Sequence, residues 1–247
     1  MLRRGMTAHA AAPTEEGEHK MMTTTIAEAP HDLASPRAAP GSSTRLVTEL
    51  ADLAELAAPE VSVCVLRREI DPDVDAFVRG WLLPRPLSET LRVDPGAPDV
   101  AALAAGAPPS PGRDAFLDDV RGLISLFADL TGCPRIGVRL ARLDKPMCPR
   151  LHADMVTVRL VTTYVGPGTE WAEHADVRRD RLGHRANGVP DEVSGVLRAG
   201  ARLRRMDPFD VGLLKGEAWP GNRDRGAVHR SPPGASPRVV VTLDALA

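Results

Sequence analysis

Residues 147–171 read MCPRLHADMVTVRLVTTYVGPGTEW and combine a predicted strand with two residues that commonly bind metal ions. The strand covers residues 156–165, which are apolar and rich in β-branched side chains. Just before it stand His152 and Asp154. Side chains at positions i and i+2 leave an extended chain on the same face, so this pair can reach one ion.

A second histidine follows further along the chain. His229 lies in the segment VHRSPPGASPRVVVTLD, residues 228–244, just before a predicted strand at 239–243. Two imidazoles and one carboxylate are the ligands of the 2-His-1-carboxylate facial triad, which leaves other coordination positions open on Fe(II). We therefore predict that His152, Asp154 and His229 bind one metal ion, with a mononuclear non-haem iron site as the working hypothesis. The alternative is a surface HxD beside a strand.

Cys148 opens a different interpretation of the same residues. A thiolate together with His152, Asp154 and His229 would complete a tetrahedral zinc site. Most free cysteines, however, behave as small buried hydrophobes, and we expect Cys148 to pack in the core. A zinc-binding protein of metal storage, sensing or homeostasis, without redox chemistry, is the second hypothesis. A third is a barrel that binds a small acid without metal.

Composition sets limits on location and partners. The chain has 247 residues, is 43% hydrophobic and 3% aromatic, and carries a formal net charge of −2. This charge argues against nucleic acid or an anionic membrane as an obligate partner. Three cysteines without a CxxC pair favour a reducing compartment. No apolar run approaches the roughly 20 residues of a membrane span, and no signal peptide is recognisable, so we expect a cytoplasmic protein.

The order of predicted elements indicates an α+β fold. Residues 1–43 lack a hydrophobic period and are predicted to be a disordered tail. The next part, 44–132, is predicted to be helical, with helices at 45–57, 71–81 and 113–130, a strand at 61–66 and a loop at 84–112. After residue 133 strands prevail, at 136–141, 156–165, 211–214, 227–229 and 239–243. We expect N-terminal helices packed on a C-terminal metal-binding sandwich or barrel, 133–247, with 44–247 forming one domain.

The strand half resembles the double-stranded β-helix, a jelly-roll or cupin-like barrel, of Fe(II)/2-oxoglutarate-dependent dioxygenases. The matching positions are the HxD motif, the turn Gly-Pro-Gly-Thr at 166–169, the distal His229 and Arg238. The resemblance implies Fe(II) as the metal, 2-oxoglutarate as co-substrate with its carboxylate at Arg238, and hydroxylation of an unknown substrate. Arginine suits this role because its planar fork donates two parallel hydrogen bonds. Many of these enzymes carry Ser or Thr two residues further on, where this chain has Val240.

A closer resemblance covers roughly residues 45–247. The segments MCPRLHAD, TTYVGPGTEW, LLKGE and VHRSPP resemble a bacterial family known as domain of unknown function 1826, a label that implies no reaction.

Other polar residues extend the candidate site. Tyr164, the only tyrosine, is a candidate to hydrogen-bond the co-substrate carboxylate or to pack with its hydroxyl on the rim. We expect a small-molecule substrate, or an acidic one if the arginines between 178 and 205 line the cavity mouth. His174 and His184 stand in charged sequence and are expected to be solvated. The sequence sets no oligomeric state.

Overall fold

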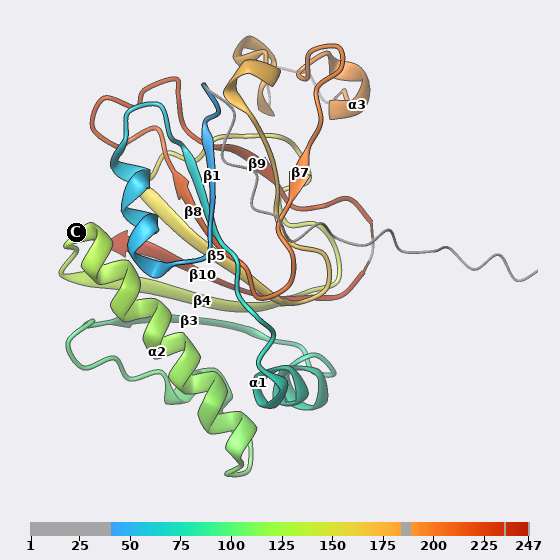
Figure 1. Ribbon diagram of the computed structural model, residues 1–247. Coiled ribbons are helices and arrows are strands. Elements are labelled where there is room, and N and C mark those ends of the chain that lie inside the picture. Colours follow the sequence, from blue (N-terminus) through green and yellow to red (C-terminus); the bar gives the residue numbers. More distant parts are fainter. Residues whose placement is uncertain (1–40, 184–188, 235, 247) are drawn as a thin grey trace, which may run out of the picture. The chain divides into compact units, whose positions relative to one another are not determined.

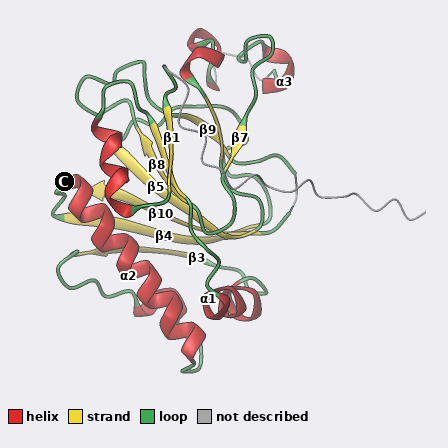
Figure 2. Cartoon of the chain, in the orientation of Figure 1, coloured by secondary structure: helices red, strands yellow, loops and turns green. Residues whose placement is uncertain are grey.

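The computed structural model describes residues 41–183, 189–234 and 236–246 (Figure 1). The strands of these residues form two sheets. The larger sheet has seven strands in the order β1-β2-β8-β5-β10-β4-β3, and the smaller has three in the order β7-β6-β9. Helices and strands occur together, which confirms the mixed α+β class (Figure 2).

The bounds of the elements are as follows. The seven-stranded sheet contains β1 (Thr44–Val47), β2 (Val63–Leu66), β3 (Ser88–Val93), β4 (Arg135–Leu143), β5 (Val158–Val165), β8 (Val211–Lys215) and β10 (Arg238–Leu246). The three-stranded sheet contains β6 (Glu170–Ala172), β7 (Arg204–Arg205) and β9 (Val228–Arg230). The α-helices are α1 (Pro72–Phe77), α2 (Pro111–Thr131) and α3 (Asp191–Ser194). Short 3-10 helices cover Leu50–Ala57, Ala101–Ala104, His174–Asp176 and Arg179–Arg181, and a π-helical turn covers Val78–Leu82.

Helix α2 has the start and stop signals that its sequence predicts. The side chain of Ser110 accepts a hydrogen bond from the N–H of Arg113 at 3.2 Å, and Pro111 occupies the first turn. Gly132 ends the helix with a φ of 62°, a left-handed conformation that favours glycine. The ring of Phe116 packs 5.4 Å from that of Tyr164 on β5, within a core that the helix shares with the sheet.

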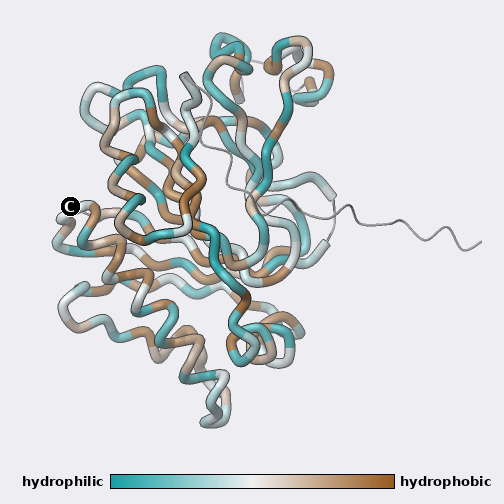
Figure 3. The backbone as a smooth tube through the Cα atoms, viewed as in Figure 1, coloured by the Kyte–Doolittle hydropathy of each residue, from teal (hydrophilic) through white to brown (hydrophobic). Residues whose placement is uncertain are grey.

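Strand β10 shows how the sheet separates an apolar face from a polar one. It pairs antiparallel with both β4 and β5 in the middle of the sheet. Val239 and Val241 belong to the core shared with α2, whereas Arg238, Val240 and Thr242 line a cavity on the other face. This alternation follows from the two-residue period of a strand. Hydrophobic stretches, brown in Figure 3, recur along these strands.

A second core lies between the two sheets. Trp171 of β6 and Met206, next to β7, belong to one buried cluster with Val161, Leu214 and Val240 of the large sheet. The small sheet therefore packs over the face that α2 leaves free.

Two predicted segments differ from the structure. The predicted helix at 45–57 is wrong in its first part, because Thr44–Val47 forms β1 and pairs parallel with β2, and only Leu50–Ala57 is helical. The predicted loop at 84–112 contains β3, which pairs antiparallel with β4. Both strands are defined by partners distant in sequence, which local periodicity does not reveal.

The predicted boundary at residue 132, between a helical part and a strand-rich part, also separates strands that belong to one sheet. Strands β1, β2 and β3 come from the part predicted to be helical, yet they belong to the same sheet as β4 and β10. The predicted disordered tail, 1–43, lies outside the described residues except for its last three. Among these, Ser43 is buried, and its N–H and hydroxyl each donate to Glu173 at 2.8 Å. In the described part of the chain, no helix has the length and apolar character needed to cross a membrane.

Candidate metal centre

The three predicted metal ligands lie together. His152 forms an isolated bridge with His229 of β9, and Asp154 follows in irregular chain. One potential ligand atom from each side chain lies within 4.8 Å of the other two. The Nε2 atoms of His152 and His229 are each 3.5 Å from a carboxylate oxygen of Asp154. Among the described residues, this is the one group of three or more His, Cys, Asp or Glu side chains with such spacing.

Backbone carbonyls fix the orientation of both imidazole rings. The Nδ1–H of His152 donates to the carbonyl oxygen of Arg150 at 2.8 Å, and that of His229 donates to the carbonyl oxygen of Ala227 at 3.0 Å. A carbonyl can only accept, so Nδ1 carries the proton in each ring. The Nε2 atoms are therefore turned toward Asp154. Metal-binding histidines are commonly oriented in this way, with the other ring N–H donating to a backbone carbonyl or a carboxylate.

Asp154 is kept in its charged form. Burial alone would raise the pKa of its carboxyl, but the neighbouring imidazoles of His152 and His229 and the charge of Arg159 outweigh burial and lower that pKa well below its usual range. Arg159 Nη1 lies 2.6 Å from Asp154, and its Nε donates to Asp244 at 2.8 Å. Arg159 therefore holds the carboxylate through Oδ2, the oxygen that His229 also faces.

The centre attracts positive charge. Burial lowers the pKa of His152, but the hydrogen bonds with Asp154 and the Arg150 carbonyl outweigh it, and the net effect raises that pKa. Two ring nitrogens and a carboxylate facing one another repel unless a proton or a cation lies between them. Imidazole and carboxylate are also ligands that suit Fe(II), so the residues present fit such an ion.

A cavity opens beside these ligands. Its empty volume is about 450 Å³, part of it open to solvent. The lining residues are Leu143, Met147, Cys148, His152, Arg159, Val161, Thr169, Leu214, His229, Arg230, Ser231, Arg238, Val240 and Thr242. The cavity thus joins two metal-ligand candidates to the arginine that the sequence assigned to a co-substrate.

Arg238 is a buried cation that forms no ion pair with the described residues. The residue is 4% exposed, and in the described residues no carboxylate oxygen lies within 4.0 Å of its guanidinium. Its Nη2 donates to the hydroxyl of Thr163 at 3.3 Å, whereas its buried Nε has no partner there. Burial, and then the charge of Arg205, lowers the pKa of Arg238 to about 10. A buried charge is costly unless it is paired, so this position favours an anion in the cavity.

The comparisons with known proteins place the chain in a family. Residues 47–244 match the family described as "Protein of unknown function (DUF1826)". The chain belongs to this DUF1826 family. No curated protein matches the sequence.

Several solved structures are similar to this DUF1826 chain at low sequence identity. The rice dioxygenase for auxin oxidation is 17% identical, with 83% of this chain and 82% of that chain covered and a TM-score of 0.49. The 2-oxoglutarate complex of the Arabidopsis thaliana dioxygenase for auxin oxidation 1 is 13% identical, covers 82% and 91%, and has a TM-score of 0.46. HygX from Streptomyces hygroscopicus, with nickel and 2-oxoglutarate bound, is 13% identical, covers 80% and 86%, and has a TM-score of 0.45.

Two motifs of the DUF1826 chain owe their glycines to close backbone approach at this site. In LLKGE, a Cβ on Gly216 would overlap the carbonyl oxygen of Val156, and the next N–H, of Glu217, donates to the carbonyl of Asp154 at 2.9 Å. In the Gly-Pro-Gly-Thr turn, Gly166 has a φ of 87°, and a Cβ there would lie 2.9 Å from Cγ of Arg238. The first glycine therefore allows the packing that fixes the backbone at Asp154, and the second makes room for the arginine.

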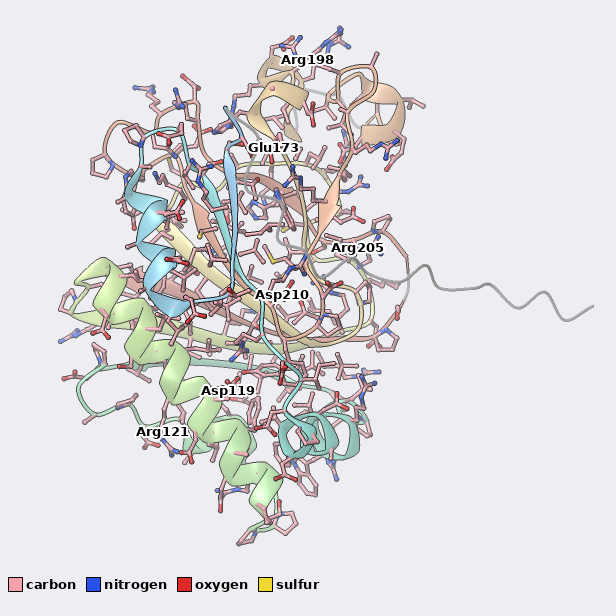
Figure 4. The ribbon with its side chains drawn as sticks, viewed as in Figure 1. Asp119, Arg121, Glu173, Arg198, Arg205 and Asp210 are labelled. Atoms are coloured by element: carbon pink, nitrogen blue, oxygen red, sulfur yellow. The ribbon has the colours of Figure 1, made fainter. Side chains whose placement is uncertain are left out.

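Tyr164 lies away from the cavity of the DUF1826 chain, and its expected role is corrected. Its hydroxyl donates to Asp119 of α2 at 2.5 Å, and Figure 4 labels Asp119 on that helix. Its ring packs edge-on against Phe116 and Phe209, at 5.4 and 5.3 Å. Arg159 and Val161 of the same strand line the cavity, whereas Tyr164 points to the helix side. A co-substrate at Arg238 is therefore not within reach of this hydroxyl.

Cys148 also departs from expectation. It is exposed and lines the cavity instead of packing in the core. The reason is local, because Cys148 lies in irregular chain, where its carbonyl accepts from the N–H of Ser231 at 2.8 Å. Its sulfur is not part of the His152, Asp154 and His229 group.

The remaining expectations concern charged residues around the site. His174 is half-buried, not solvated, because its Nδ1 accepts from Arg179 Nη2 at 2.8 Å. His184 lies outside the described residues. Arg204 and Arg205 form ion pairs with Glu173 at 3.2 Å and Glu170 at 2.5 Å. Sequence reasoning missed Arg159, whose signal was its position in the strand that follows the HxD motif.

Proposed function

We propose that this chain is a non-haem Fe(II)- and 2-oxoglutarate-dependent oxygenase that hydroxylates a small-molecule substrate. The observation that carries the proposal is the combination of one metal-ligand group and one unpaired buried arginine. His152 and His229 line the same cavity as Arg238. A dianionic 2-oxo acid supplies the counter-ion that Arg238 lacks, and its other end reaches the ligand side of the cavity.

The proposed metal site rests on three candidate ligands and on Arg159, which contacts one of them, Asp154. His152, Asp154 and His229 would bind Fe(II) through two imidazole nitrogens and a carboxylate oxygen. When bound, the ion supplies the redox chemistry that couples oxygen and a 2-oxo acid to hydroxylation. His152 and His229, together with Arg159, keep Asp154 charged, so that this ligand needs no deprotonation when an ion enters.

The co-substrate half rests on Arg238 and the hydroxyls near it. Thr163 accepts a hydrogen bond from Arg238, and Thr169 lines the cavity. Thr169 would stand in for the hydroxyl residue that Val240 replaces, because it lines the cavity. The guanidinium would donate in parallel to both carboxylate oxygens, while a threonine hydroxyl donates a further bond.

We also propose a finer description of the fold, in which the two sheets are the two sides of a double-stranded β-helix. Support comes from the buried cluster that joins Trp171 of the small sheet to Val161 and Val240 of the large one. The metal ligands and Arg238 then lie at the open end between the sheets.

The zinc alternative has weaker support. It required Cys148 as a fourth protein ligand, and this thiol is exposed and outside the ligand group. A group of three protein ligands leaves coordination positions for a bidentate 2-oxo acid, which favours iron and catalysis over a closed structural zinc site.

The test is a titration of protein loaded with Fe(II) in the absence of oxygen. We expect 2-oxoglutarate to bind with one equivalent per chain, and succinate to form slowly after oxygen is admitted. Protein loaded with Zn(II) serves as the control, because it should bind the 2-oxo acid without forming succinate. If the Fe(II) protein neither binds 2-oxoglutarate nor forms succinate, the oxygenase proposal is wrong and only a metal site remains.

A further inference from the structure

We propose that Asp191 of α3 is a positioning residue for the metal centre and holds both histidine-bearing segments in register. The inference rests on the metal site of the proposed function. It assigns a role to a residue 40 positions from Leu151 in the sequence and outside every motif described above.

One carboxylate contacts both segments. Its Oδ1 accepts from Arg150 Nε at 3.0 Å, and its Oδ2 accepts from the backbone N–H of Leu151 at 2.7 Å. The same Oδ2 accepts from Arg230 Nη1 at 3.2 Å. Arg150 and Leu151 immediately precede His152, and Arg230 immediately follows the other histidine. Asp191 is therefore a buried side chain whose hydrogen bonds join the two ligand-bearing segments beyond their own backbone pairing.

The two histidines need such support because regular sheet structure holds them weakly. His152 lies in an isolated bridge and not in a strand, and the β9 strand around His229 has only three residues. A long ladder would fix both by many hydrogen bonds. Here the positions depend on a few contacts, of which the Leu151 N–H to Asp191 bond is the shortest, at 2.7 Å.

Burial makes the Asp191 contacts strong. Asp191 is 4% exposed and Arg230 is 6% exposed. Arg230 also donates to Glu170 at 2.9 Å and to Glu192 at 2.9 Å. Charge-assisted hydrogen bonds of this kind are stronger where water is excluded, and loss of one partner leaves the others unsatisfied.

The backbone of Asp191 is itself anchored to the same place. Val196, just after α3, belongs to a small buried cluster with Leu151 and Val228, the residues that precede His152 and His229. Within α3, the Ser194 hydroxyl donates to the carbonyl of Asp191 at 3.2 Å. The packing of Val196 thus fixes the backbone that carries Asp191 next to both histidine-bearing segments. The position of the carboxylate is therefore set by buried contacts of the main chain as well as by its own hydrogen bonds.

The experiment compares Asp191→Ala and the nearly isosteric Asp191→Asn with wild type. Each protein is titrated with Co(II) without oxygen, and the visible absorption of the saturated form is recorded. We expect Asp191→Ala to lower metal affinity about 10- to 100-fold, the range for residues that orient metal ligands, and to shift the Co(II) bands. Asp191→Asn should give a smaller loss, because an amide oxygen at the Oδ2 position still accepts the hydrogen bonds from Leu151 and Arg230 and only the bond from Arg150 is lost.

The control is Asp210→Asn. Figure 4 labels Asp210. Asp210 is 1% exposed and pairs with Arg67, but it contacts neither histidine segment, so this change should destabilise the fold without altering metal affinity or spectrum. If wild type binds Co(II) and both folded Asp191 variants match it in affinity and spectrum, the positioning role is wrong. If Asp191→Ala does not fold, Asp191→Asn decides by the same comparison. If wild type binds no divalent ion, the metal site itself is wrong and the positioning role with it.

Discussion

His152 and His229 lie directly opposite each other across an antiparallel bridge. The N–H of His152 donates to the carbonyl of His229 at 3.1 Å, and the N–H of His229 donates to the carbonyl of His152 at 3.0 Å. Their ring centroids are 4.5 Å apart. This one pair of backbone hydrogen bonds therefore brings the two rings side by side.

Loss of either ring should abolish stoichiometric metal binding. We expect His152→Ala or His229→Ala to remove tight binding of one divalent ion per chain, because a site with two remaining protein ligands holds an ion poorly. Far-ultraviolet circular dichroism should stay unchanged, since the bridge uses backbone atoms. His174→Ala is the control and should bind metal like wild type. Wild-type affinity in both ligand variants would contradict the facial-triad assignment.

Arg238 should govern affinity for the 2-oxo acid without governing affinity for the metal. Arg238→Ala leaves the carboxylate of the bound co-substrate unpaired, at a cost of about 3–5 kcal/mol. Arg238→Lys should recover part of that loss, because an ammonium cannot donate two parallel hydrogen bonds. The measurement is calorimetric titration of the anaerobic Fe(II) forms with 2-oxoglutarate. Equal affinity in wild type and Arg238→Ala would place the co-substrate elsewhere.

The grouping of the three candidate ligands could be predicted from the sequence, because each member has a local signature. His152 and Asp154 stand two apart, and His229 precedes an apolar strand at a distance typical of the resembled enzymes. Arg238 follows from the same strand, since its alternation with Val239 puts it on the polar face. These inferences need only short stretches of chain.

Tyr164 shows where such reasoning ends. Irregular chain separates Asp154 from the start of β5 at Val158, so the side on which the HxD residues lie does not determine which strand residues share it. Position 164 then falls on the helix face, while Thr163 meets Arg238. The role of Asp191 likewise could not be predicted from the sequence, because its partners are a backbone N–H and arginines that only the fold brings near it.

Replacement of Cys148 should leave metal binding almost unchanged. Cys148→Ser keeps the size of an exposed side chain outside the ligand group, so we expect affinities for Fe(II) and Zn(II) within about twofold of wild type. Parallel titrations with the two ions provide the measurement. A loss of zinc affinity by orders of magnitude would restore the zinc-protein hypothesis, because only a thiolate ligand explains such selectivity.

Gly216→Ala should weaken the candidate metal centre, although Gly216 is not one of the candidate ligands. The added Cβ would overlap the Val156 carbonyl and crowd that of Asp154, both of them backbone atoms that cannot rotate away. We expect a loss of about 1–3 kcal/mol in unfolding free energy and weaker metal binding in the protein that folds. Gly122→Ala, on the exposed side of α2 with open space around its Cα, is the matched control and should be neutral or stabilising.

His174 should make the fold sensitive to mild acid. Burial, and then the charges of Arg179 and Arg225, lower its pKa from 6.5 to about 4, although Glu173 opposes them and Lys215 adds to them. The unfolded chain then binds a proton that the folded chain does not, so stability falls as pH drops from about 6.5 toward 4. Between pH 7 and 5 the loss should be about 1–2 kcal/mol after allowance for partial exposure.

Urea unfolding of wild type and His174→Gln at both pH values isolates this contribution. The variant should lose less stability on acidification, and the difference between the two proteins cancels the titration of other histidines. An identical pH dependence in the two proteins would show that His174 is not held neutral.

The central place of β10 has a consequence for the order of folding. The strand pairs with β4 and β5 on its two sides, and Leu246 of β10 aligns with Arg135 at the start of β4. Pairing between strands distant in sequence is slow to form, because the entropy cost of closing a long loop comes before the stabilising contacts between the strands. Arg238 enters the cavity only when this strand docks, so the proposed co-substrate pocket should form last. Refolding followed by 2-oxoglutarate binding should therefore lag behind refolding followed by helical signal.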